Sequence, residues 1–517
     1  NDPMIRHFKV PRSWAYTPAD TLAGGAWDAA SPETVGQFSG VGYAFAQHLR
    51  AMLEDDVAIG IVNSTWGGSR IEPWMSAAAL GTTPEEAEAA EKARVNARLA
   101  GLRDLLGELP AEDAGLVDGA ALWADPAYDD SSWGTIELGA NWESAGYPDL
   151  DGVAWYRTTF ELTEEQADLP AFVILGMIDD SDQAWINGVS IGSTDMAYNR
   201  ERRYRVRPSA LRPGRNVLAI RVEDFGGGGG INATGNPLSF QSPSGSLLLD
   251  GPWRFKVARV DADFSFDKNQ IPTLLYNAMI APLQPFPVRG VIWYQGESNA
   301  GTVDDAKAYE DLFAGLIQNW RSDWASPELP FFWAQLAAYH EEDTEPPAES
   351  PWATHRASQT AALELPATGQ AILTDLGDAR DIHPRNKKDV GIRLAQTALN
   401  VAYGREDVPR SGPTYAGYEL NESRVTVTFD HVGEALMSSG DAVEGFALQS
   451  EDGTWAWASA EITGPNTVSV YAASIPAPVG LRFAWADNPS RANLYASNDR
   501  PAVPFQIGDL TNRGSSP

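Results

Sequence analysis

The chain has 517 residues, which is enough for about three domains of ordinary size. Its 38 Lys and Arg stand against 70 Asp and Glu, and the resulting net charge of −32 argues against nucleic acid and anionic membranes as partners. The lack of cysteine excludes disulfides and thiolate metal sites, and no apolar run approaches the ~20 residues that a membrane-spanning helix needs.

Segments of different character follow one another along the chain. Residues 1–117 have an α/β pattern, with a strand-like run at 57–62 and a helix predicted over 83–109. Residues 118–262 instead show short alternating strands and frequent turn signals. Among these signals is the pair Asn187-Gly188 between two apolar runs, which predicts a hairpin. This second segment is therefore predicted to be an antiparallel β-sandwich.

The α/β pattern returns in residues 263–411. Residues 412–517 again show short strands and turns, which is typical of a small C-terminal β-module. A run of five glycines at 226–230 predicts a loop within the sandwich. Because neither α/β segment has enough strands to form a core alone, we expect one α/β domain interrupted by an inserted sandwich.

Polar side chains follow an apolar strand at 291–292, in the place where α/β sheets bind ligands. They belong to Gln295, Glu297 and Asn299. The Asn299 amide is suited to holding an oxyanion, although asparagine at such a place also ends strands through a local turn. We expect Gln295 and Glu297 to brace the loop or to contact substrate hydroxyls.

A second polar group lies well downstream, after an apolar run at 371–373. Here Asp381 precedes His383 by two residues. Such a carboxylate can hold one ring nitrogen of a histidine so that the other acts as a general base, as in hydrolytic triads. The competing interpretation is a surface turn that caps the helix starting near Pro384.

A nucleophile is missing from this set of residues. Ser64 and Ser298 are the nearest candidates, but neither has the Gly-x-Ser-x-Gly context of a nucleophile elbow. No spacing of His, Asp or Glu is typical of a metal site, so we expect neither a metal nor a cofactor.

Five motifs, in this order, resemble the sialate O-acetylesterase family, which belongs to the SGNH-hydrolase superfamily and includes bacterial acetylxylan esterases. They are FSGVGY at 38–43, NSTWGGSRIEPW at 63–74, LYNAMIAPL at 275–283, VIWYQGESNA at 291–300 and DIHPRNK at 381–387. The resemblance implies a flavodoxin-like three-layer α/β/α hydrolase domain. Residues 118–262 are similar to the sugar-binding jelly-roll of family-two glycosidases, notably WING at 185–188.

The resemblance also implies roles for individual residues. Gly67 or Gly68 matches the glycine whose backbone N–H binds the oxyanion, although a glycine pair is more commonly a tight turn. Asn299 matches the oxyanion asparagine, and His383 matches the general base. The residues expected to contact substrate are Trp66, Gln295 and Glu297.

The acid that orients the histidine has two candidates. Asp381 is the one we expect. The superfamily more often has two residues between this acid and the histidine, and the corresponding position here is occupied by Arg380. Asp378 therefore remains a rival.

The family's nucleophile lies in a Gly-Gln-Ser-Asn-Met segment, which these 517 residues do not contain. The chain begins with Asn1 and shows neither an initiator methionine nor a signal peptide. We therefore expect the serine segment upstream of Asn1, either on a separate N-terminal fragment or left out of this chain. Genuine loss of the segment is the remaining interpretation.

The sequence thus predicts a carbohydrate O-acetylesterase with a Ser-His-Asp mechanism that acts on acetylated oligo- or polysaccharides. The acidic surface disfavours anionic sugars, so a xylan-type glycan is favoured over sialate. The family's habits indicate a periplasmic or secreted location. One alternative is a non-catalytic carbohydrate-binding protein, which would have no reason to keep the pair His383 and Asp381. Another is a glycosidase, which would need two carboxylates bracketing a sugar.

Overall fold

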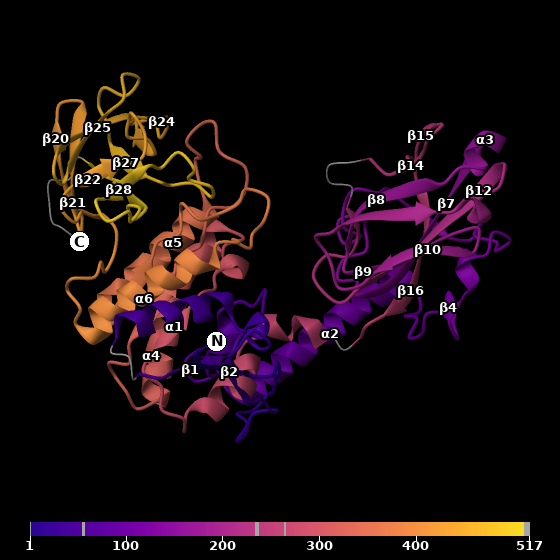
Figure 1. Ribbon diagram of the computed structural model, residues 1–517, viewed down its shortest axis with the longest axis horizontal. Coiled ribbons are helices and arrows are strands. Elements are labelled where there is room, and N and C mark those ends of the chain that lie inside the picture. Colours follow the sequence, from indigo (N-terminus) through magenta and orange to yellow (C-terminus); the bar gives the residue numbers. More distant parts are fainter. Residues whose placement is uncertain (1, 54–56, 233–236, 263–264, 511–517) are drawn as a thin grey trace. The chain divides into compact units, whose positions relative to one another are not determined.

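The computed structural model describes residues 2–53, 57–232, 237–262 and 265–510. The chain forms two compact units (Figure 1). The discontinuous unit contains Asn1–Ala87 and Asn269–Pro517, and the inserted unit contains Glu88–Lys268. One unit is thus interrupted in sequence by the other.

The inserted unit begins before the first predicted strand of the sandwich. Helix α2 (Pro84–Leu106) coincides with the helix predicted over 83–109, and most of it belongs to this unit. Leu102 is buried in the core of the unit, and the Arg98 guanidinium lies 3.3 Å from the Asp151 carboxylate. These long-range contacts are invisible in the local pattern that placed a boundary at residue 118. The boundary predicted at 262 adjoins residues 263–264, which lie outside the described residues.

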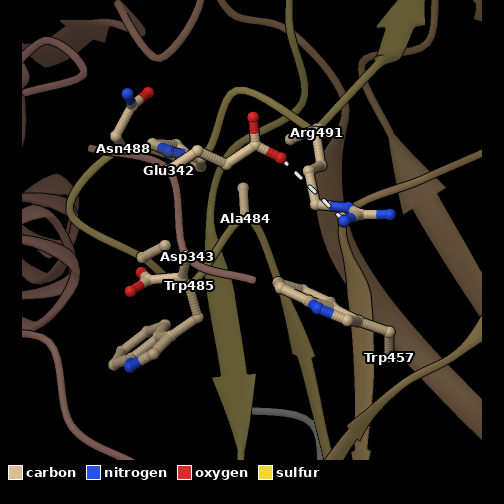
Figure 2. A pocket seen from close by; sticks show the side chains of 11 residues that line it. Glu342, Asp343, Trp457, Ala484, Trp485, Asn488 and Arg491 are labelled. Carbon is tan, nitrogen blue, oxygen red and sulfur yellow. Dashed lines mark ion pairs between the residues drawn. The ribbon is translucent and has the colours of Figure 1, made fainter. Parts of the chain in front are cut away.

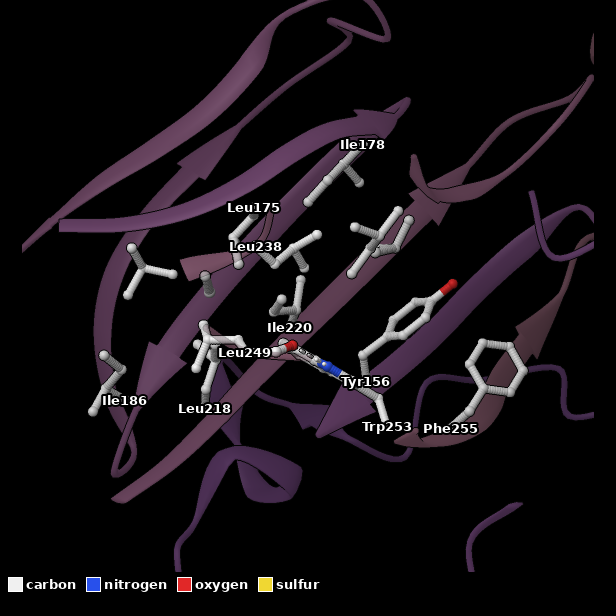
Figure 3. Close-up of a cluster of buried hydrophobic side chains, with 14 of the residues drawn as sticks. Tyr156, Leu175, Ile178, Ile186, Leu218, Ile220, Leu238, Leu249, Trp253 and Phe255 are labelled. Carbon is white, nitrogen blue, oxygen red and sulfur yellow. Dashed lines mark hydrogen bonds between the residues drawn. The ribbon is translucent and has the colours of Figure 1, made fainter. Parts of the chain in front are cut away.

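Two antiparallel sheets share the core of the inserted unit (Figure 3). The first has the order β10-β9-β12-β7-β16-β6, and the second has the order β11-β8-β14-β15 with β13 also paired to β8. The strands of the first sheet are β6 (Gly134–Ile136), β7 (Gly152–Leu162), β9 (Ser181–Ile186), β10 (Val189–Thr194), β12 (Gly214–Asp224) and β16 (Trp253–Val260). Those of the second are β8 (Ala171–Asp179), β11 (Glu201–Val206), β13 (Gly230–Asn232), β14 (Ser239–Ser242) and β15 (Gly245–Leu248).

Side chains from both sheets meet in this core. Tyr156 and Phe255 come from the first sheet, and Leu175 and Ile178 come from the second (Figure 3). A shared core between antiparallel sheets is the sandwich that the sequence predicts, while the jelly-roll connectivity stays a prediction. The unit also contains the short helix α3 (Glu164–Ala167) and the small pair β4 (Leu116–Val117) and β5 (Ala120–Ala121).

The predicted hairpin at Asn187-Gly188 is confirmed. Strands β9 and β10 pair antiparallel on either side of these two residues. Both adopt positive φ, +49° for Asn187 and +80° for Gly188, as a two-residue turn matching the strand twist requires.

The discontinuous unit contains two three-stranded sheets, with the orders β2-β1-β3 and β17-β18-β19. Their strands are β1 (Asp2–Lys9), β2 (Trp27–Ala30), β3 (Ile59–Asn63), β17 (Val291–Trp293), β18 (Phe331–Ala334) and β19 (Thr368–Ala371). All pairings are parallel except that of β1 with β2. The α/β class is therefore correct, whereas the single sheet of a three-layer domain stays a prediction.

Helices connect these strands, as parallel pairing demands. They are α1 (Gly40–Met52), α4 (Val303–Asp323) and α5 (Pro351–Ala361), and a further helix, α6 (Lys387–Tyr403), follows the last of these strands. Helix α1 packs on α6, and α4 packs on α5. Hydroxyl or amide side chains cap their first turns: Thr302 for α4, Ser350 for α5 and Asn386 for α6 each accept a backbone N–H.

Burial differs among the parallel strands. Every residue of β18 and β19 is buried, as is usual for parallel strands covered on both faces. Strands β3 and β17 are mostly half-buried, and each is the last strand of its sheet within the described part of the chain.

Residues after α6 form the predicted C-terminal β-module around a core of their own. Its strands are β20 (Thr414–Asn421), β21 (Arg424–Asp430), β22 (Leu436–Ser438), β23 (Phe446–Gln449), β24 (Trp455–Trp457), β25 (Ser459–Gly464), β26 (Thr467–Tyr471), β27 (Gly480–Phe483), β28 (Leu494–Ala496) and β29 (Phe505–Ile507). In the part of the chain that the structure describes, no helix is both long enough and apolar enough to cross a membrane.

Candidate active site

The loop that follows β3 carries the glycine pair. Gly67 and Gly68 are exposed, and Gly68 has a positive φ of +71°, which favours glycine. Their carbonyl groups accept hydrogen bonds from the Asn269 amide (2.8 Å) and the Ser298 hydroxyl (2.8 Å). These two hydrogen bonds hold the exposed glycine turn in place.

Asn299, in the loop that follows β17, is fully buried. Its Oδ1 accepts hydrogen bonds from the Ile71 backbone N–H (2.9 Å) and from Gln295 Nε2 (3.0 Å). Its Nδ2 donates to a Glu72 carboxylate oxygen at 3.1 Å. An amide nitrogen has two hydrogens, so Asn299 can keep this bond and still donate a second one.

The loops after β3 and β17 are joined by these hydrogen bonds and by an ionic network. The Arg70 guanidinium lies 3.1 Å from the Glu72 carboxylate and 3.2 Å from that of Asp305, and it donates to the Ser298 carbonyl at 3.1 Å. In the sequence, Arg70 and Glu72 stand out only as parts of the motif at 63–74. Their position directly beside the candidate oxyanion asparagine could not be read from spacing.

Gln295 braces the second loop from inside. Its Nε2 donates to the Ser69 carbonyl at 2.9 Å, and its Oε1 accepts from the Tyr309 hydroxyl at 2.9 Å. The side chain is buried and engaged at both ends. Of the two roles expected for Gln295, bracing the loop is the one this geometry serves.

A buried histidine packs against the backbone of the same loop. His355 on α5 is fully buried, and its ring lies 4.0 Å from that of Tyr309. A Cβ on Gly296 would lie only 2.2 Å from the His355 ring, so the backbone passes directly over it. Burial, helped by the neighbouring Arg356, lowers the pKa of His355 to about 3. This ring is therefore neutral at physiological pH and is too weak a base for proton transfer.

Glu297 is half-buried in the loop after β17. Its charge interacts with residues that follow β19. Burial raises the pKa of Glu297, while backbone N–H groups and then the charges of His383 and Lys387 oppose that rise. The influence of His383 and Lys387 indicates that the loop after β19 lies on the same side of the unit as Glu297.

The loop after β19 holds the candidate base. His383 is exposed, and its Nδ1 lies 3.4 Å from Asp381 Oδ1. The same carboxylate oxygen accepts the His383 backbone N–H at 3.0 Å, and this bond is the largest cause of the lowered pKa of Asp381. The Asp378 side chain instead accepts the Arg380 backbone N–H at 3.0 Å. The geometry favours Asp381 over Asp378 as the neighbour that orients the ring.

The capping interpretation of Asp381 is wrong. The residue that caps α6 is Asn386, whose Oδ1 accepts the Asp389 backbone N–H at 3.1 Å. Asp381 lies several residues before this cap, so the histidine loop is a separate feature.

The hydroxyl groups of both candidate serines donate hydrogen bonds to backbone carbonyl groups. The Ser64 hydroxyl donates to the Met279 carbonyl at 3.1 Å, and the Ser298 hydroxyl donates to the Gly68 carbonyl at 2.8 Å. Trp66 is half-buried against the core, with the Arg12 guanidinium 5.8 Å from its ring centre. A substrate contact by Trp66 stays a prediction.

Comparison with known proteins places these residues in a family. The family described as "Carbohydrate esterase, sialic acid-specific acetylesterase" matches residues 263–400, and "Beta-galactosidase second all-beta domain" matches residues 118–228. A solved carbohydrate acetylesterase from Xanthomonas citri, XAC1771, has 31% sequence identity and a TM-score of 0.60, over 98% of this chain and 74% of that one. The chain belongs to the sialate O-acetylesterase family of carbohydrate esterases.

Mammalian members of the family are similar over part of their length. Sialate O-acetylesterase of Mus musculus is 31% identical over 267 residues, which are 47% of this chain and 48% of that protein. The Homo sapiens protein is 29% identical over 270 residues, 47% of this chain and 50% of that protein. The chain thus spans about half the length of the curated relatives it matches.

This esterase-family chain also has an aromatic hollow (Figure 2). The side chains that matter for its chemistry are Glu342, Asp343, Trp457, Trp485, Asn488 and Arg491. They come from the segment after β18 and from the C-terminal β-module. The carboxylate of Glu342 lies 3.9 Å from the Arg491 guanidinium, which in turn lies 5.2 Å from the ring centre of Trp457.

Specific contacts tie the hollow to the histidine loop. Asp487 Oδ2 lies 3.0 Å from His340 Nδ1, and the Asn488 amide donates to the His340 carbonyl at 2.7 Å. The next residue back, Tyr339, packs against the same buried cluster as Ile382, which directly precedes His383. A chain of contacts therefore leads from Asn488 in the hollow, through His340 and Tyr339, to the cluster that also holds Ile382.

Proposed function

We propose that this chain supplies the general base and the oxyanion site of a carbohydrate O-acetylesterase. His383 takes the proton of a serine hydroxyl as the serine attacks the acetyl carbonyl carbon, and Asp381 orients the imidazole. Asn299 Nδ2, together with a backbone N–H of Gly67 or Gly68, stabilises the oxyanion. Loss of the sugar alkoxide, protonated by His383, leaves an acetyl-serine. Water activated by the same histidine then releases acetate.

One observation carries this proposal: the loops after β3 and β17 are hydrogen-bonded to each other, and His383 lies in the loop after β19, a parallel strand of the same sheet as β17. Asn299 in the loop after β17 is fully buried and retains one free donor hydrogen within the described residues. Three hydrogen bonds fix the Asn299 amide, so it need not reorient when negative charge develops beside it. A low reorganisation energy of this kind is what oxyanion stabilisation requires.

The nucleophilic serine in this proposal comes from a segment N-terminal to Asn1. Strands β3 and β17 support that placement, because each is an edge of its sheet and both are only half-buried. Their following loops are bonded to each other through Ser298 and Gly68 at 2.8 Å. A strand added at these edges would satisfy backbone groups there and would end close to Asn299, where a serine is needed.

The proposed substrate is an acetylated neutral glycan of the xylan type. The net charge of −32 disfavours a carboxylated sugar such as sialate. The hollow supports the same choice, because Trp457 and Trp485 offer flat apolar faces while Glu342, Asp343 and Asn488 offer hydrogen-bond acceptors and a donor amide. A periplasmic or secreted location is part of this proposal, since such polymers lie outside the cytoplasm.

A fluorophosphonate probe tests the proposal. The full-length protein that contains this chain is labelled, and the adduct is mapped by peptide mass spectrometry, with His383→Ala and Asp378→Asn variants alongside. The expected adduct lies on a serine outside residues 1–517, with labelling lost in His383→Ala and retained in Asp378→Asn. An adduct on Ser64 or Ser298 would overturn the site assignment. No adduct in an active-site-intact preparation would favour a non-catalytic carbohydrate-binding protein.

A further inference from the structure

Three carboxylates converge in the inserted unit, at the ends of two strands from different sheets. Asp179 ends β8, Asp180 follows it, and Asp224 ends β12. One carboxylate oxygen from each lies within 4.8 Å of the other two. Asp224 is distant in sequence from the other two residues, which is why spacing alone indicated no metal site.

The most buried member of this acidic cluster lacks a partner for one oxygen. Asp224 is completely inaccessible to solvent, and its Oδ2 is buried without a hydrogen bond within the described residues. Its other oxygen accepts only a long bond of 3.3 Å from the Gly226 backbone N–H. Because an uncompensated carboxylate oxygen is costly to bury, this atom indicates that something else neutralises the cluster.

The nearest arginine is committed elsewhere. The Arg202 guanidinium pairs with the buried Asp182 carboxylate at 2.7 Å and donates to the Ile178 carbonyl at 2.6 Å. Asp180 Oδ2 accepts the Phe225 backbone N–H at 3.1 Å, which satisfies only one of its lone pairs. Among the ion pairs of the described residues, none involves Asp179, Asp180 or Asp224.

We propose that Asp179, Asp180 and Asp224 bind a Ca²⁺ ion. Calcium takes six to eight oxygen ligands at about 2.3–2.6 Å, so two ligands on opposite sides of one ion lie about 4.8 Å apart. The three oxygens all lie within 4.8 Å of one another, close enough for one such ion to contact all of them. Magnesium demands a near-ideal octahedron and gives up its waters reluctantly, and zinc prefers His or Cys ligands that this cluster does not contain.

The ion would link the two sheets to the glycine-rich loop. The loop at 225–229 leaves β12 immediately after Asp224 and leads into β13, where Gly230 pairs with Asp179. A cation bound here would contact the residue that precedes this loop, and it would contact Asp179, the strand partner of the residue that follows the loop. Its role is structural, because it neutralises buried charge where the sheets meet.

Protons are the alternative way to neutralise the cluster. Burial raises the pKa of Asp179 to about 7 and that of Asp224 to about 9, with neighbouring acids adding to both shifts. The charged groups that act on these two carboxylates are Asp151, Glu143, Asp180 and Arg202. A cation that displaces these protons must bind more tightly as the pH rises, which separates the two cases experimentally.

The test uses the whole chain after treatment with EGTA. Calcium chloride, and magnesium chloride at the same concentration, are added to the wild type, to Asp224→Asn and to Glu165→Gln, an exposed acid of the same unit. Thermal unfolding and titration calorimetry are followed, and circular dichroism checks that each variant is folded. Calcium should bind one-to-one and raise the melting temperature by several degrees in the wild type and in Glu165→Gln. The Asp224→Asn variant should lose both effects, and the wild-type Kd should fall at least about tenfold from pH 6 to pH 8.

Three results would each overturn the proposal. One is the absence of calcium binding by the folded wild type at pH 8. A second is an equal stabilisation by calcium and magnesium that persists in Asp224→Asn, which is a general ionic effect. A third is an Asp224→Asn variant that is as stable without metal as the wild type is with calcium and that binds calcium equally well. None of these readouts depends on esterase activity, so they are independent of the proposed function.

Discussion

The contact between His383 and Asp381 is long and open to water. The two side-chain atoms are 3.4 Å apart, and 63% of the His383 side chain is exposed. Catalytic hydrogen bonds are often loose before substrate binds and tighten in the complex. The backbone bond from His383 to the same carboxylate, at 3.0 Å, already fixes which acid is close enough to complete the pair.

Replacing Asp381 by Asn should therefore separate the two candidate acids. We expect kcat for hydrolysis of p-nitrophenyl acetate to fall about 10²–10⁴-fold in Asp381→Asn, because the ring loses the charge that stabilises its protonated form. KM should change little. The matched variant Asp378→Asn should stay within about twofold of the wild type, since its carboxylate serves a local turn. A larger loss in Asp378→Asn than in Asp381→Asn would reverse the assignment.

His355 should make the protein sensitive to acid. Its ring is neutral in the folded protein, where its pKa is about 3, and it becomes protonated in the unfolded chain below about pH 6.5. The unfolded state thus binds more protons between these values, and stability is lost as the pH falls through that window. The greatest possible loss from this residue is about 5 kcal/mol.

Urea unfolding of His355→Asn at pH 4, 5, 6 and 7 measures this contribution. We expect a shallower fall in the free energy of unfolding towards low pH than in the wild type. His431→Asn is the control, because His431 is exposed and asparagine tolerates its positive φ of +58°. Buried acids with raised pKa act in the opposite sense in both proteins, so the difference in slope isolates His355. Identical slopes would contradict the prediction.

The candidate residues differ in how easily each can be identified from the sequence alone. Asp381 and His383 stand two positions apart, so a short motif shows them together. Asn299 is visible as a polar residue at the end of an apolar run. Its partners Glu72 and Ile71 lie more than two hundred positions away, and no local pattern joins them.

At the scale of elements, the loop from Gln295 to Asn299 works as a braced unit between β17 and α4. Two side chains hold it in place: Tyr309 of α4 donates a hydrogen bond to Gln295, and the ring of His355 on α5 contacts Gly296. Because its backbone touches the His355 ring, the loop has no room for a side chain at Gly296.

Gly296→Ala should thus be destabilising. The added Cβ would lie 2.2 Å from the His355 ring, so the loop or the ring must move. We expect a loss of about 1–3 kcal/mol in the free energy of unfolding, measured in urea, and a large fall in kcat as Asn299 shifts. Gly301→Ala is the matched control, because a Cβ there meets nothing within 4 Å. Equal stability of the two variants would show that the loop yields easily.

Elements with a local signal were predicted well. The hairpin at Asn187-Gly188 and helix α2 follow from two-residue and helical patterns that the chain carries in plain view. The extent of the inserted unit did not follow, because α2 joins it through Leu102 and Arg98, which contact residues far along the chain. Nor could any pattern show that β3 and β17 end separate sheets, since strand order depends on long-range pairing.

At the scale of the whole molecule, recognition of a polymer can be separated from the chemistry. The hollow containing Trp485 lies in the C-terminal β-module and the segment after β18, while the groups proposed to react lie on the loops after β3, β17 and β19. A small ester has no sugar to place in the hollow.

Trp485→Ala should accordingly raise KM for an acetylated xylan about threefold to tenfold, which is the scale of one lost aromatic contact. The kcat and KM for p-nitrophenyl acetate should stay within about twofold of the wild type. Tyr471→Ala, at an exposed position of the same β-module, should leave both substrates unaffected. If both substrates suffer equally in Trp485→Ala, the hollow has a structural role and not a recognition role.

The edges of β3 and β17 have a consequence for handling the protein. Unpaired strand edges are templates on which other molecules can add strands, and natural proteins normally cover them. Residues 1–517 produced alone therefore carry an aggregation hazard beside the loops proposed to hold the oxyanion. The net charge of −32 opposes such association through mutual repulsion, and salt weakens that protection. Dilute, low-salt conditions are the ones in which this chain should remain dispersed.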